Sequence, residues 1–325
     1  MNVTIRDIEA AAECLDGIAV RTPLIHNAEL DQATSGRIFV KPECLQVTGS
    51  FKIRGAFNLM SRLSEEQAKR GVVAWSSGNH AQGVAAAGGI LGIDAAIVMP
   101  EDAPKAKLEN TRRLGGEVIT YDRYSGDREA IARAVAEERG AELVPSYDHA
   151  DIIGGQGTVG LEIAEQMQAK GVNPDQVLIC CGGGGLSAGS TLAIKDRYPD
   201  CSVFIVEPLE FDDTTRSLQA GERLRIDDAA RSICDALQAD MPGRLTFEIN
   251  RRLLAGGLTV SDDEVRDSMR FAFRNLKLVA EPGGSVALAA ALSGKIETAD
   301  KTTVIVISGG NVDAGLFSTI MQGAA

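Results

Sequence analysis

Short apolar runs alternate with longer segments of mixed polarity through the middle of the chain. The apolar runs lie at 72–75, 94–100, 117–121 and 142–147. The segments between them that we interpret as helices lie at 79–92, 105–115 and 127–140. Buried strands that alternate with helices in this way indicate a parallel sheet covered on both faces. The pattern therefore predicts a compact small domain over residues 71–147.

The same alternation returns on both sides of this segment. Further strands are predicted at 38–45, 176–181, 202–207 and 302–308. Further helices are predicted at 55–69, 158–171, 186–197, 243–255, 262–275 and 284–293. We therefore predict an α/β fold of two domains, each with a mainly parallel, twisted sheet flanked by helices. Residues 1–70 and 148–325 would form the large domain, into which the small one is inserted.

Composition narrows the range of partners. The chain has 325 residues and a formal net charge of −12, which argues against a nucleic-acid partner because phosphates attract basic surfaces. No apolar run approaches the length that spans a bilayer, and the acidic, amphipathic amino terminus is unlike a secretory signal. The six cysteines form no CxxC pair, and several lie inside apolar runs. We therefore expect reduced, buried thiols and a cytoplasmic location.

One lysine stands in an unusual context. Lys52 follows Phe51 directly within the run VTGSFKIRGAFN, which is rich in small and apolar residues. Lysine is usually a surface residue, so we interpret Lys52 as an amine in a poorly hydrated pocket. Desolvation would lower its pKa and make it a nucleophile towards an aldehyde. An ordinary lysine at a helix start, capped by Thr48 or Ser50, remains the alternative.

Four consecutive glycines, Gly182, Gly183, Gly184 and Gly185, stand between a predicted strand and a predicted helix. Such a loop exposes backbone N–H groups at a helix amino terminus, where a phosphate binds well. A flexible loop is the alternative. No Lys-Ser/Thr pair follows the glycines and the GxGxxG spacing is missing, which disfavours nucleotide loops. Glu207 ends the next strand, so a dinucleotide site is weakened but stays open.

Two other strand ends carry polar residues suited to a ligand. Ser76-Ser77-Gly78-Asn79-His80 begins a helix, where Ser77 offers a hydroxyl and Asn79 an amide. A purely capping role is the alternative, and His80 alone is more typical of a structural helix residue. Ser308-Gly309-Gly310-Asn311 follows the final strand. Ligands of open α/β sheets collect at the carboxyl ends of strands, so these loops and the glycine loop are expected to meet.

A cofactor that needs an amine, a phosphate cradle and a partner for a ring nitrogen is pyridoxal 5′-phosphate (PLP). The chain resembles the PLP enzymes of the tryptophan-synthase β-subunit fold (fold type II), and within them the serine/threonine dehydratase and serine racemase family. The motifs SFKIRGA, SSGNHAQG, GGGGLSAG and SGGN carry the resemblance, in family order and over nearly the whole chain.

The resemblance implies a role for each of these residues. Lys52 would hold PLP covalently, with Phe51 against the cofactor and Asn79 at its 3′-oxygen. Gly182 to Gly185 and Leu186 would hold the phosphate. Ser308 would face the pyridine nitrogen, and a hydroxyl there offers no anion to a protonated ring. We expect a weaker electron sink that favours prompt loss of a β-substituent.

The resemblance also implies the reaction. Lys52, once freed, would take the α-proton of a β-hydroxy amino acid such as serine, threonine or 3-hydroxyaspartate. Loss of the hydroxyl would lead to a 2-oxo acid and ammonia. Ser77 would stand on the opposite face and, by returning a proton, would make the enzyme an amino-acid racemase, which is the alternative. A dinucleotide- or phosphate-binding protein without covalent chemistry is a third possibility.

Further residues follow from the same family. Substrate contacts are expected from Ser76, Ser77, Asn79, His80 and Arg128. A divalent-cation loop would take carboxylates from Glu207 and Asp213 and the carbonyl of Phe211, oxygen ligands that suit Mg²⁺ or Ca²⁺. The alternative to the cation loop is an acidic surface turn. The alternative for Arg128 is an ordinary arginine on a helix surface. A homodimer is implied by the family only.

Two stretches depart from the family pattern. Asp235-Ala236-Leu237 stands where much of the family has Asp-Gly-Leu, and the added methyl group could crowd the open face of the cofactor. QADMPGRLTF at 238–247 replaces a Ser/Thr-containing stretch that touches the substrate. Arg244 in this stretch could recognise a second carboxylate, as on 3-hydroxyaspartate. The identity of the substrate is therefore open.

Overall fold

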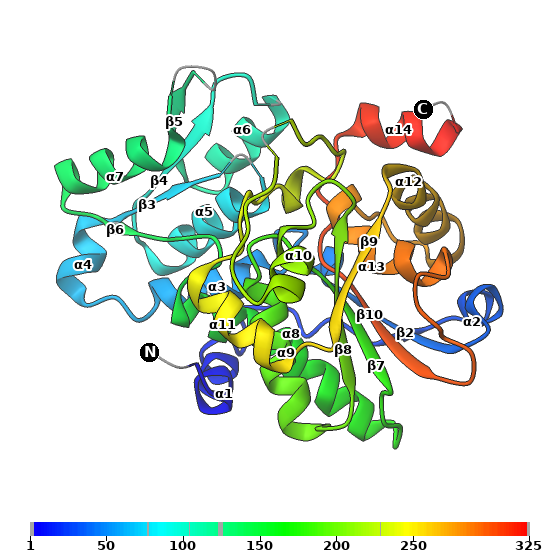
Figure 1. Ribbon diagram of the computed structural model, residues 1–325. Coiled ribbons are helices and arrows are strands. Elements are labelled where there is room, and N and C mark those ends of the chain that lie inside the picture. The colour runs from blue at the N-terminus through cyan, green and yellow to red at the C-terminus, as the bar shows by residue number, and fades with distance from the viewer. Residues whose placement is uncertain (1–2, 77, 104, 123–125, 228, 324–325) are drawn as a thin grey trace.

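The computed structural model describes residues 3–76, 78–103, 105–122, 126–227 and 229–323. Two sheets lie side by side, one built from strands β3–β6 and the other from β1, β2 and β7–β10 (Figure 1). Their helices cover them on both faces. This is the predicted α/β architecture.

The larger sheet has the order β1-β2-β10-β7-β8-β9. Strand β1 runs antiparallel to β2, and all other neighbours are parallel. Its strands are Ile25–His26 (β1), Arg37–Pro42 (β2), Gln176–Cys180 (β7), Ser202–Pro208 (β8), Gly256–Val260 (β9) and Thr302–Ile307 (β10). The central strands β10, β7 and β8 are almost completely buried, as expected for a sheet covered on both faces.

The smaller sheet is wholly parallel, with the order β5-β4-β3-β6. Its strands are Val72–Trp75 (β3), Ala95–Pro100 (β4), Glu117–Tyr121 (β5) and Glu142–Leu143 (β6). Its helices are Glu65–Arg70 (α4), Asn79–Leu91 (α5), Lys105–Arg113 (α6) and Arg128–Arg139 (α7). All four strands fall within the predicted segment 71–147. The domain boundaries themselves stay a prediction.

The remaining helices belong mainly to the larger sheet. They are Ile5–Cys14 (α1), Ala28–Thr34 (α2), Lys52–Met60 (α3), Ala150–Ala169 (α8), Gly185–Arg197 (α9), Asp213–Ala220 (α10), Arg244–Leu253 (α11), Asp262–Phe271 (α12), Pro282–Leu292 (α13) and Ala314–Gln322 (α14). A π-helical turn, Ala272–Leu276, continues α12. Helix α3 is an exception, because Ile53, Phe57 and Met60 pack into the core of the smaller sheet.

Two predicted helices differ from the observed ones. The helix predicted at 55–69 is two helices, α3 and α4. The helix predicted at 158–171 begins eight residues earlier, at Ala150, because glycines let α8 pack unusually close to its neighbours. A Cβ atom on Gly155 would lie 2.4 Å from the carbonyl oxygen of Arg54, and one on Gly160 would lie 2.3 Å from that of Ser190. Glycine therefore serves close helix contact here and does not end the helix.

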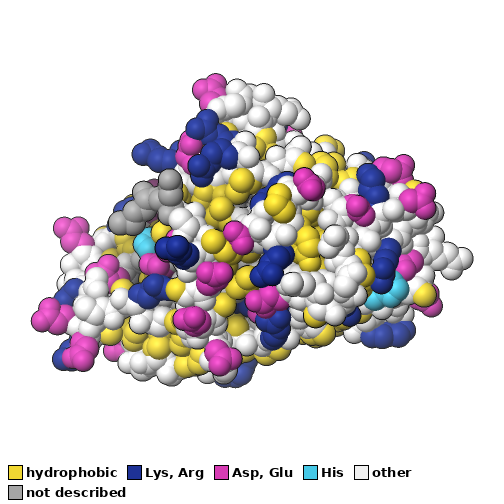
Figure 2. Space-filling view, turned by 90° about the horizontal axis from the view of Figure 1, so that it is seen from below, with side chains coloured by type: hydrophobic (Ala, Val, Ile, Leu, Met, Phe, Trp, Pro, Cys, Tyr) yellow, Lys and Arg dark blue, Asp and Glu magenta, His cyan; other side chains and the backbone are white. Residues whose placement is uncertain are grey.

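The surface agrees with the composition. Acidic and basic side chains are mixed over the face seen in Figure 2, with apolar side chains between them. Among the described residues, no helix is long and apolar enough to cross a membrane.

Candidate active site

A cavity of about 900 Å³ lies where carboxyl ends of strands from both sheets converge. The loops after β3, β7 and β10 and the start of α3 all contribute to it. The predicted residues that line it are Phe51, Lys52, Ser76, Asn79, His80, Arg128, Gly182, Gly183, Gly184, Gly185, Leu186 and Ser308. Ser77 lies outside the described residues. Segments more than 200 positions apart in the sequence thus meet in one place, as the strand-end argument predicted.

Lys52 is the first residue of α3, and its amine is inside the cavity wall. The Nζ atom donates to the carbonyl of Ser146 at 3.0 Å and lies 5.1 Å from the centre of the Phe51 ring. Burial lowers the pKa of Lys52 to about 8, although the neighbouring Cys180 and Glu281 act in the opposite direction. About a tenth of this amine is therefore uncharged at pH 7, far more than of an ordinary lysine.

The alternative interpretation of Lys52 required a cap from Thr48 or Ser50. Helix α3 has no side-chain cap, and the hydroxyl groups of Thr48 and Ser50 have no hydrogen-bond partner among the described residues. Lys52 is thus not an ordinary lysine beside a capped helix start.

The glycine loop runs from the end of β7 into α9. Gly184 has φ +91°, in the region that favours glycine, and it is the residue before the helix. A Cβ atom on Gly183 would lie 2.3 Å from the ring of Tyr147. The backbone conformation of Gly184 and the ring beside Gly183 therefore exclude side chains at these two positions. The first N–H groups of α9 border the cavity. The residues present fit a phosphate group.

Asn79 is held from two sides. Its Nδ2 donates to Oε1 of Glu281 at 2.5 Å, and its Oδ1 accepts from Nδ2 of Asn311 at 2.7 Å. A Cβ atom on Gly309 would lie 2.1 Å from Oε1 of Glu281. The first glycine of SGGN thus makes room for the carboxylate that orients Asn79. Among the described residues, the second N–H of the Asn79 amide has no partner, so it is available to a ligand.

Glu281 was not predicted from the sequence. It lines the cavity and is buried, and burial together with the charge of Asp235 raises its pKa to about 7. The sequence offers only a glutamate before Pro282 at a helix start, which is a common pattern. Its contact with Asn79 links residues 202 positions apart.

His80 behaves as a structural residue. Its Nε2 is 2.8 Å from the carbonyl of Val144, and the ring is buried. Burial and the charge of Lys52 lower the pKa of His80 to about 3, so the ring is neutral at ordinary pH. A neutral histidine whose Nε2 donates to the main chain cannot offer a cation to a substrate carboxylate.

Several cations lie around the cavity. Arg128 lines it, close enough to Tyr147 for its charge to act on the phenol. Arg244 is not among the lining residues, and Arg223 and Arg225 from the preceding loop line it instead. Lys107 of α6 also lines it and forms an ion pair with Asp235, 2.5 Å long, across the cavity from the larger sheet.

The predicted cation loop lies outside this cavity. Both carboxylate oxygens of Glu207 accept hydrogen bonds from the start of α10, at 3.1 Å from the N–H of Thr214 and 2.8 Å from that of Thr215. Asp213 is fully buried, and its Oδ1 has no partner among the described residues. Burial raises the pKa of both carboxyl groups, and the charge of Glu207 raises that of Asp213 further. Two buried acids with an unsatisfied oxygen fit a cation, although the described residues contain no group of three acidic, His or Cys ligands.

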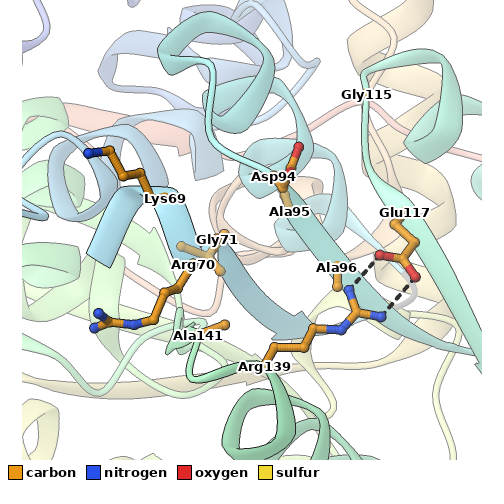
Figure 3. Close-up of a pocket in the computed structure, with 11 residues that line it drawn as sticks. Lys69, Arg70, Gly71, Asp94, Ala95, Ala96, Gly115, Glu117, Arg139 and Ala141 are labelled. Atoms are coloured by element: carbon orange, nitrogen blue, oxygen red, sulfur yellow. Dashed lines mark hydrogen bonds and ion pairs between the residues drawn. The ribbon is translucent and has the colours of Figure 1, made fainter. Parts of the chain in front are cut away.

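A second cavity opens at the other end of the smaller sheet (Figure 3). Glu117 and Arg139 pair across it through two hydrogen bonds. None of the predicted site residues lines it. The larger cavity is therefore the candidate active site.

Comparison with known proteins supports this choice. Residues 16–309 match the model of the family of pyridoxal-phosphate dependent enzymes. The chain belongs to that family. The prediction of PLP as the cofactor is thereby confirmed.

Individual relatives cover nearly the whole length of the chain. An L-threo-3-hydroxyaspartate ammonia-lyase from a Pseudomonas species is 45% identical over 98% of this chain and 98% of its own. A serine racemase from Schizosaccharomyces pombe is 41% identical over 98% and 97%. The structure of maize serine racemase superimposes with a TM-score of 0.93 at 36% identity, over 99% and 98%. The predicted fold type and the predicted class, a PLP-dependent lyase, are confirmed.

Proposed function

We propose that this enzyme removes water and then ammonia from a β-hydroxy amino acid, with 3-hydroxyaspartate as the leading substrate. The observation that carries the proposal is the Lys52 amine, with its lowered pKa, in one cavity with the glycine loop and Asn79. The high identity to a hydroxyaspartate ammonia-lyase supports the choice of substrate.

Each residue has a defined task in this proposal. PLP, when bound, withdraws electrons from the α-carbon of the amino acid. Lys52 accepts the α-proton as a neutral amine, which its lowered pKa allows near neutral pH. Asn79 would donate an N–H to the 3′-oxygen, and Gly182 to Gly185 and Leu186 would hold the phosphate. Phe51 would lie against the cofactor.

Ser308 would face the ring nitrogen without a negative charge. Beside it, burial raises the pKa of the Cys180 thiol to about 11, so this neighbour is uncharged as well. Neither the Ser308 hydroxyl nor the neutral Cys180 thiol would supply an anion to the ring nitrogen, which favours its unprotonated form. This supports rapid loss of the β-hydroxyl over a long-lived carbanion.

Arg128 is proposed to bind the second carboxylate of a dicarboxylic substrate. It lines the cavity from α7, a helix of the smaller sheet, whereas the glycine loop belongs to the larger sheet. Because an arginine–carboxylate pair is a charge-assisted contact, its loss should weaken binding about tenfold or more. Ser76, Asn79 and His80 would bind the first carboxylate through main-chain groups at the start of α5, since the His80 ring is already bonded to Val144. A contact from Ser77 stays a prediction.

A substrate panel tests these assignments. We expect wild-type enzyme to form a 2-oxo acid from L-threo-3-hydroxyaspartate faster than from serine or threonine, and Lys52→Ala to lose turnover. Arg128→Met should raise KM about tenfold for hydroxyaspartate and far less for serine. Arg133→Met is the matched control, because this arginine also lines the cavity but is paired with Glu129 at 2.5 Å. Exchange of serine enantiomers without 2-oxo acid would favour the racemase instead.

A divalent cation is proposed at Glu207, Asp213 and the carbonyl of Phe211. The unsatisfied, buried oxygen of Asp213 supports it, since a cation would satisfy that oxygen and relieve the repulsion between the two acids. Mg²⁺ and Ca²⁺ both accept such oxygen ligands.

A homodimer is proposed from exposed apolar side chains. Leu45, Val47, Phe273 and Val279 are 48%, 50%, 45% and 46% exposed. The segment at Cys44 and Val279 adjoin through Gly310. A second copy of the chain would remove this apolar surface from water, and light scattering of the purified protein would detect the dimer.

The six free cysteines fit the proposed cytoplasmic location.

A further inference from the structure

Helix α11 lies behind the glycine loop, on the side away from the cavity. Thr246 and Asn250 are four residues apart on α11 and therefore lie on one face of it. Both are fully buried, and neither lines the cavity. A Cβ atom on Gly184 would lie 3.0 Å from Oγ1 of Thr246 and from Nδ2 of Asn250. This face of α11 thus contacts the loop directly.

The polar groups of this face bind the carbonyl groups of the loop. Oγ1 of Thr246 donates to the carbonyl of Gly183 at 2.7 Å, and the N–H of Gly243 donates to the same oxygen at 3.3 Å. Oγ of Ser187 donates to the carbonyl of Gly184 at 3.0 Å. Nδ2 of Asn250 in turn donates to Oγ of Ser187 at 3.0 Å.

Each of these bonds fixes the direction of a carbonyl group, and thereby also the direction of the N–H group in the same peptide. A trans peptide is planar, so its C=O and N–H point in opposite directions. When the carbonyl of Gly183 points towards α11, the N–H of Gly184 points away from it, towards the cavity. The carbonyl of Gly184 constrains the N–H of Gly185 in the same way. Glycine has wide conformational freedom, and a four-glycine loop would otherwise sample many orientations.

Helix α11 is itself held in place by Asp148. The carboxylate of Asp148 accepts hydrogen bonds from the N–H groups of Arg244, Leu245 and Thr246, at 2.9, 2.8 and 3.2 Å. A carboxylate at a helix amino terminus is favourable, and here it satisfies three unpaired donors. Asp148 follows Tyr147, whose ring lies against Gly183. Two adjacent residues therefore support the loop, Tyr147 by direct contact and Asp148 through α11.

We propose that Thr246 and Asn250 are positioning residues that orient the peptide groups of the glycine loop for the phosphate of the cofactor. This inference rests on the proposed role of the loop as the phosphate cradle. It assigns a function to the stretch at 238–247 that departs from the family pattern. The hydroxyl of Thr246 serves the cradle from behind and does not touch the substrate.

The test compares two cofactor forms that differ only in the phosphate. Apoenzyme is titrated with PLP and with pyridoxal, and binding is followed by visible absorbance. Thr246→Val removes the hydroxyl but keeps the shape, so we expect the Kd for PLP to rise about tenfold and the Kd for pyridoxal to change less than about twofold. Thr246→Ser keeps the hydroxyl and should restore PLP binding.

Thr191→Val is the matched control. Thr191 is fully buried on α9, the helix that the loop begins, and its hydroxyl has no partner among the described residues. The same substitution there should leave both Kd values unchanged. Should Thr246→Val fail to fold, Ser187→Ala tests the bond to Gly184. A smaller rise in the Kd for PLP is expected there, because the N–H of Ala188 still holds the Gly184 carbonyl at 2.9 Å.

Equal weakening of PLP and pyridoxal, or no weakening of PLP in a folded Thr246→Val or Ser187→Ala protein, would overturn the inference. These outcomes are distinct from failure of the proposed function. If wild-type apoenzyme bound neither PLP nor pyridoxal, the proposed function itself would fall.

Discussion

Buried charged groups outside the cavity and inside it differ in how they are satisfied. Outside it, Arg54 donates to Glu43 at 2.8 Å and to Glu162 at 2.6 Å, and Lys41 donates to Glu162 at 2.5 Å. In the cavity, Glu281 has one hydrogen bond, from Asn79, and no cation in contact among the described residues.

The pKa values follow this difference. Burial would raise the pKa of Glu43, but the charge and hydrogen bonds of Arg54 hold it below its ordinary value. Burial, together with the negative charge of Asp235, raises the pKa of Glu281 to about 7, and the hydrogen bond from Asn79 and the charges of Lys107 and Lys52 oppose this only in part. Both carboxyl groups are buried, so the presence or absence of a paired cation decides whether the pKa falls or rises. We interpret the paired cluster as structural and the unpaired acids as functional.

The largest effect is expected from breaking the paired cluster. Arg54→Met would leave Glu43 and Glu162 buried without their main partner, so the free energy of unfolding should fall by about 3–5 kcal/mol. Urea denaturation monitored by circular dichroism measures it. A loss below about 1 kcal/mol would show that the cluster is not what holds α3 against α8.

The next effect concerns the pH dependence of stability. The folded-state pKa of Glu281 is raised, so its contribution is fully present below the ordinary pKa of 4.5 and is lost as the pH rises through about 7. Of the order of 3 kcal/mol should be lost over this window. Glu281→Gln should remove this part of the slope in a pH series of urea denaturations.

Asp235→Asn provides the control for Glu281. Asp235 is exposed, and its charge raises the pKa of Glu281, so its removal should shorten the pH window and reduce the loss. An identical slope in wild type and Glu281→Gln would contradict the interpretation of Glu281 as an unpaired acid.

A somewhat smaller effect is expected at Glu207 and Asp213. Without a cation, the raised pKa values predict that stability falls as the pH rises through them. Mg²⁺ or Ca²⁺ at a hundredfold excess over its Kd should stabilise the fold by about 2.7 kcal/mol and suppress that fall. Thermal unfolding with and without the ion measures both. The same shift in Asp213→Asn would place the ion elsewhere.

The smallest effect is expected from an ion pair at the surface. Arg139 and Glu117 make two hydrogen bonds but are 40% and 56% exposed. Arg139→Met should cost less than about 1 kcal/mol, because water and salt screen the pair. A cost as large as that of Arg54→Met would remove the distinction between buried and exposed pairing.

Much of the fold could be predicted because its signals are local. Strands β3 and β5 have the predicted bounds, and β4, β7, β8 and β10 agree within one residue. Strand β2 ends three residues and β6 four residues earlier than predicted, because the chain turns there into the loops that reach the cavity. Strand β9 was not predicted, since Gly256 and Gly257 begin it and glycine is uncommon in strands. A Cβ atom on Gly257 would lie 2.0 Å from the hydroxyl of Thr215, so packing against α10 requires that glycine.

The site was predicted only where a residue lies in a distinctive local motif. Lys52 and the glycine loop have such motifs, and the cavity contains them. Glu281 and Thr246 do not, because each acquires its role from a partner far away in sequence, Asn79 and Gly183 respectively. Arg244 was placed near the substrate from its position alone, but the residue contributes its N–H to Asp148.

The central claim is that the amine of Lys52 binds the aldehyde of PLP in the cavity with the glycine loop. Borohydride reduction of the holoenzyme, followed by peptide mass spectrometry, tests it most directly. We predict a stable pyridoxyl-phosphate adduct on Lys52 and on none of the other lysines, with no adduct at this position in Lys52→Ala. An adduct on a different lysine, or PLP released intact after reduction, would contradict the account.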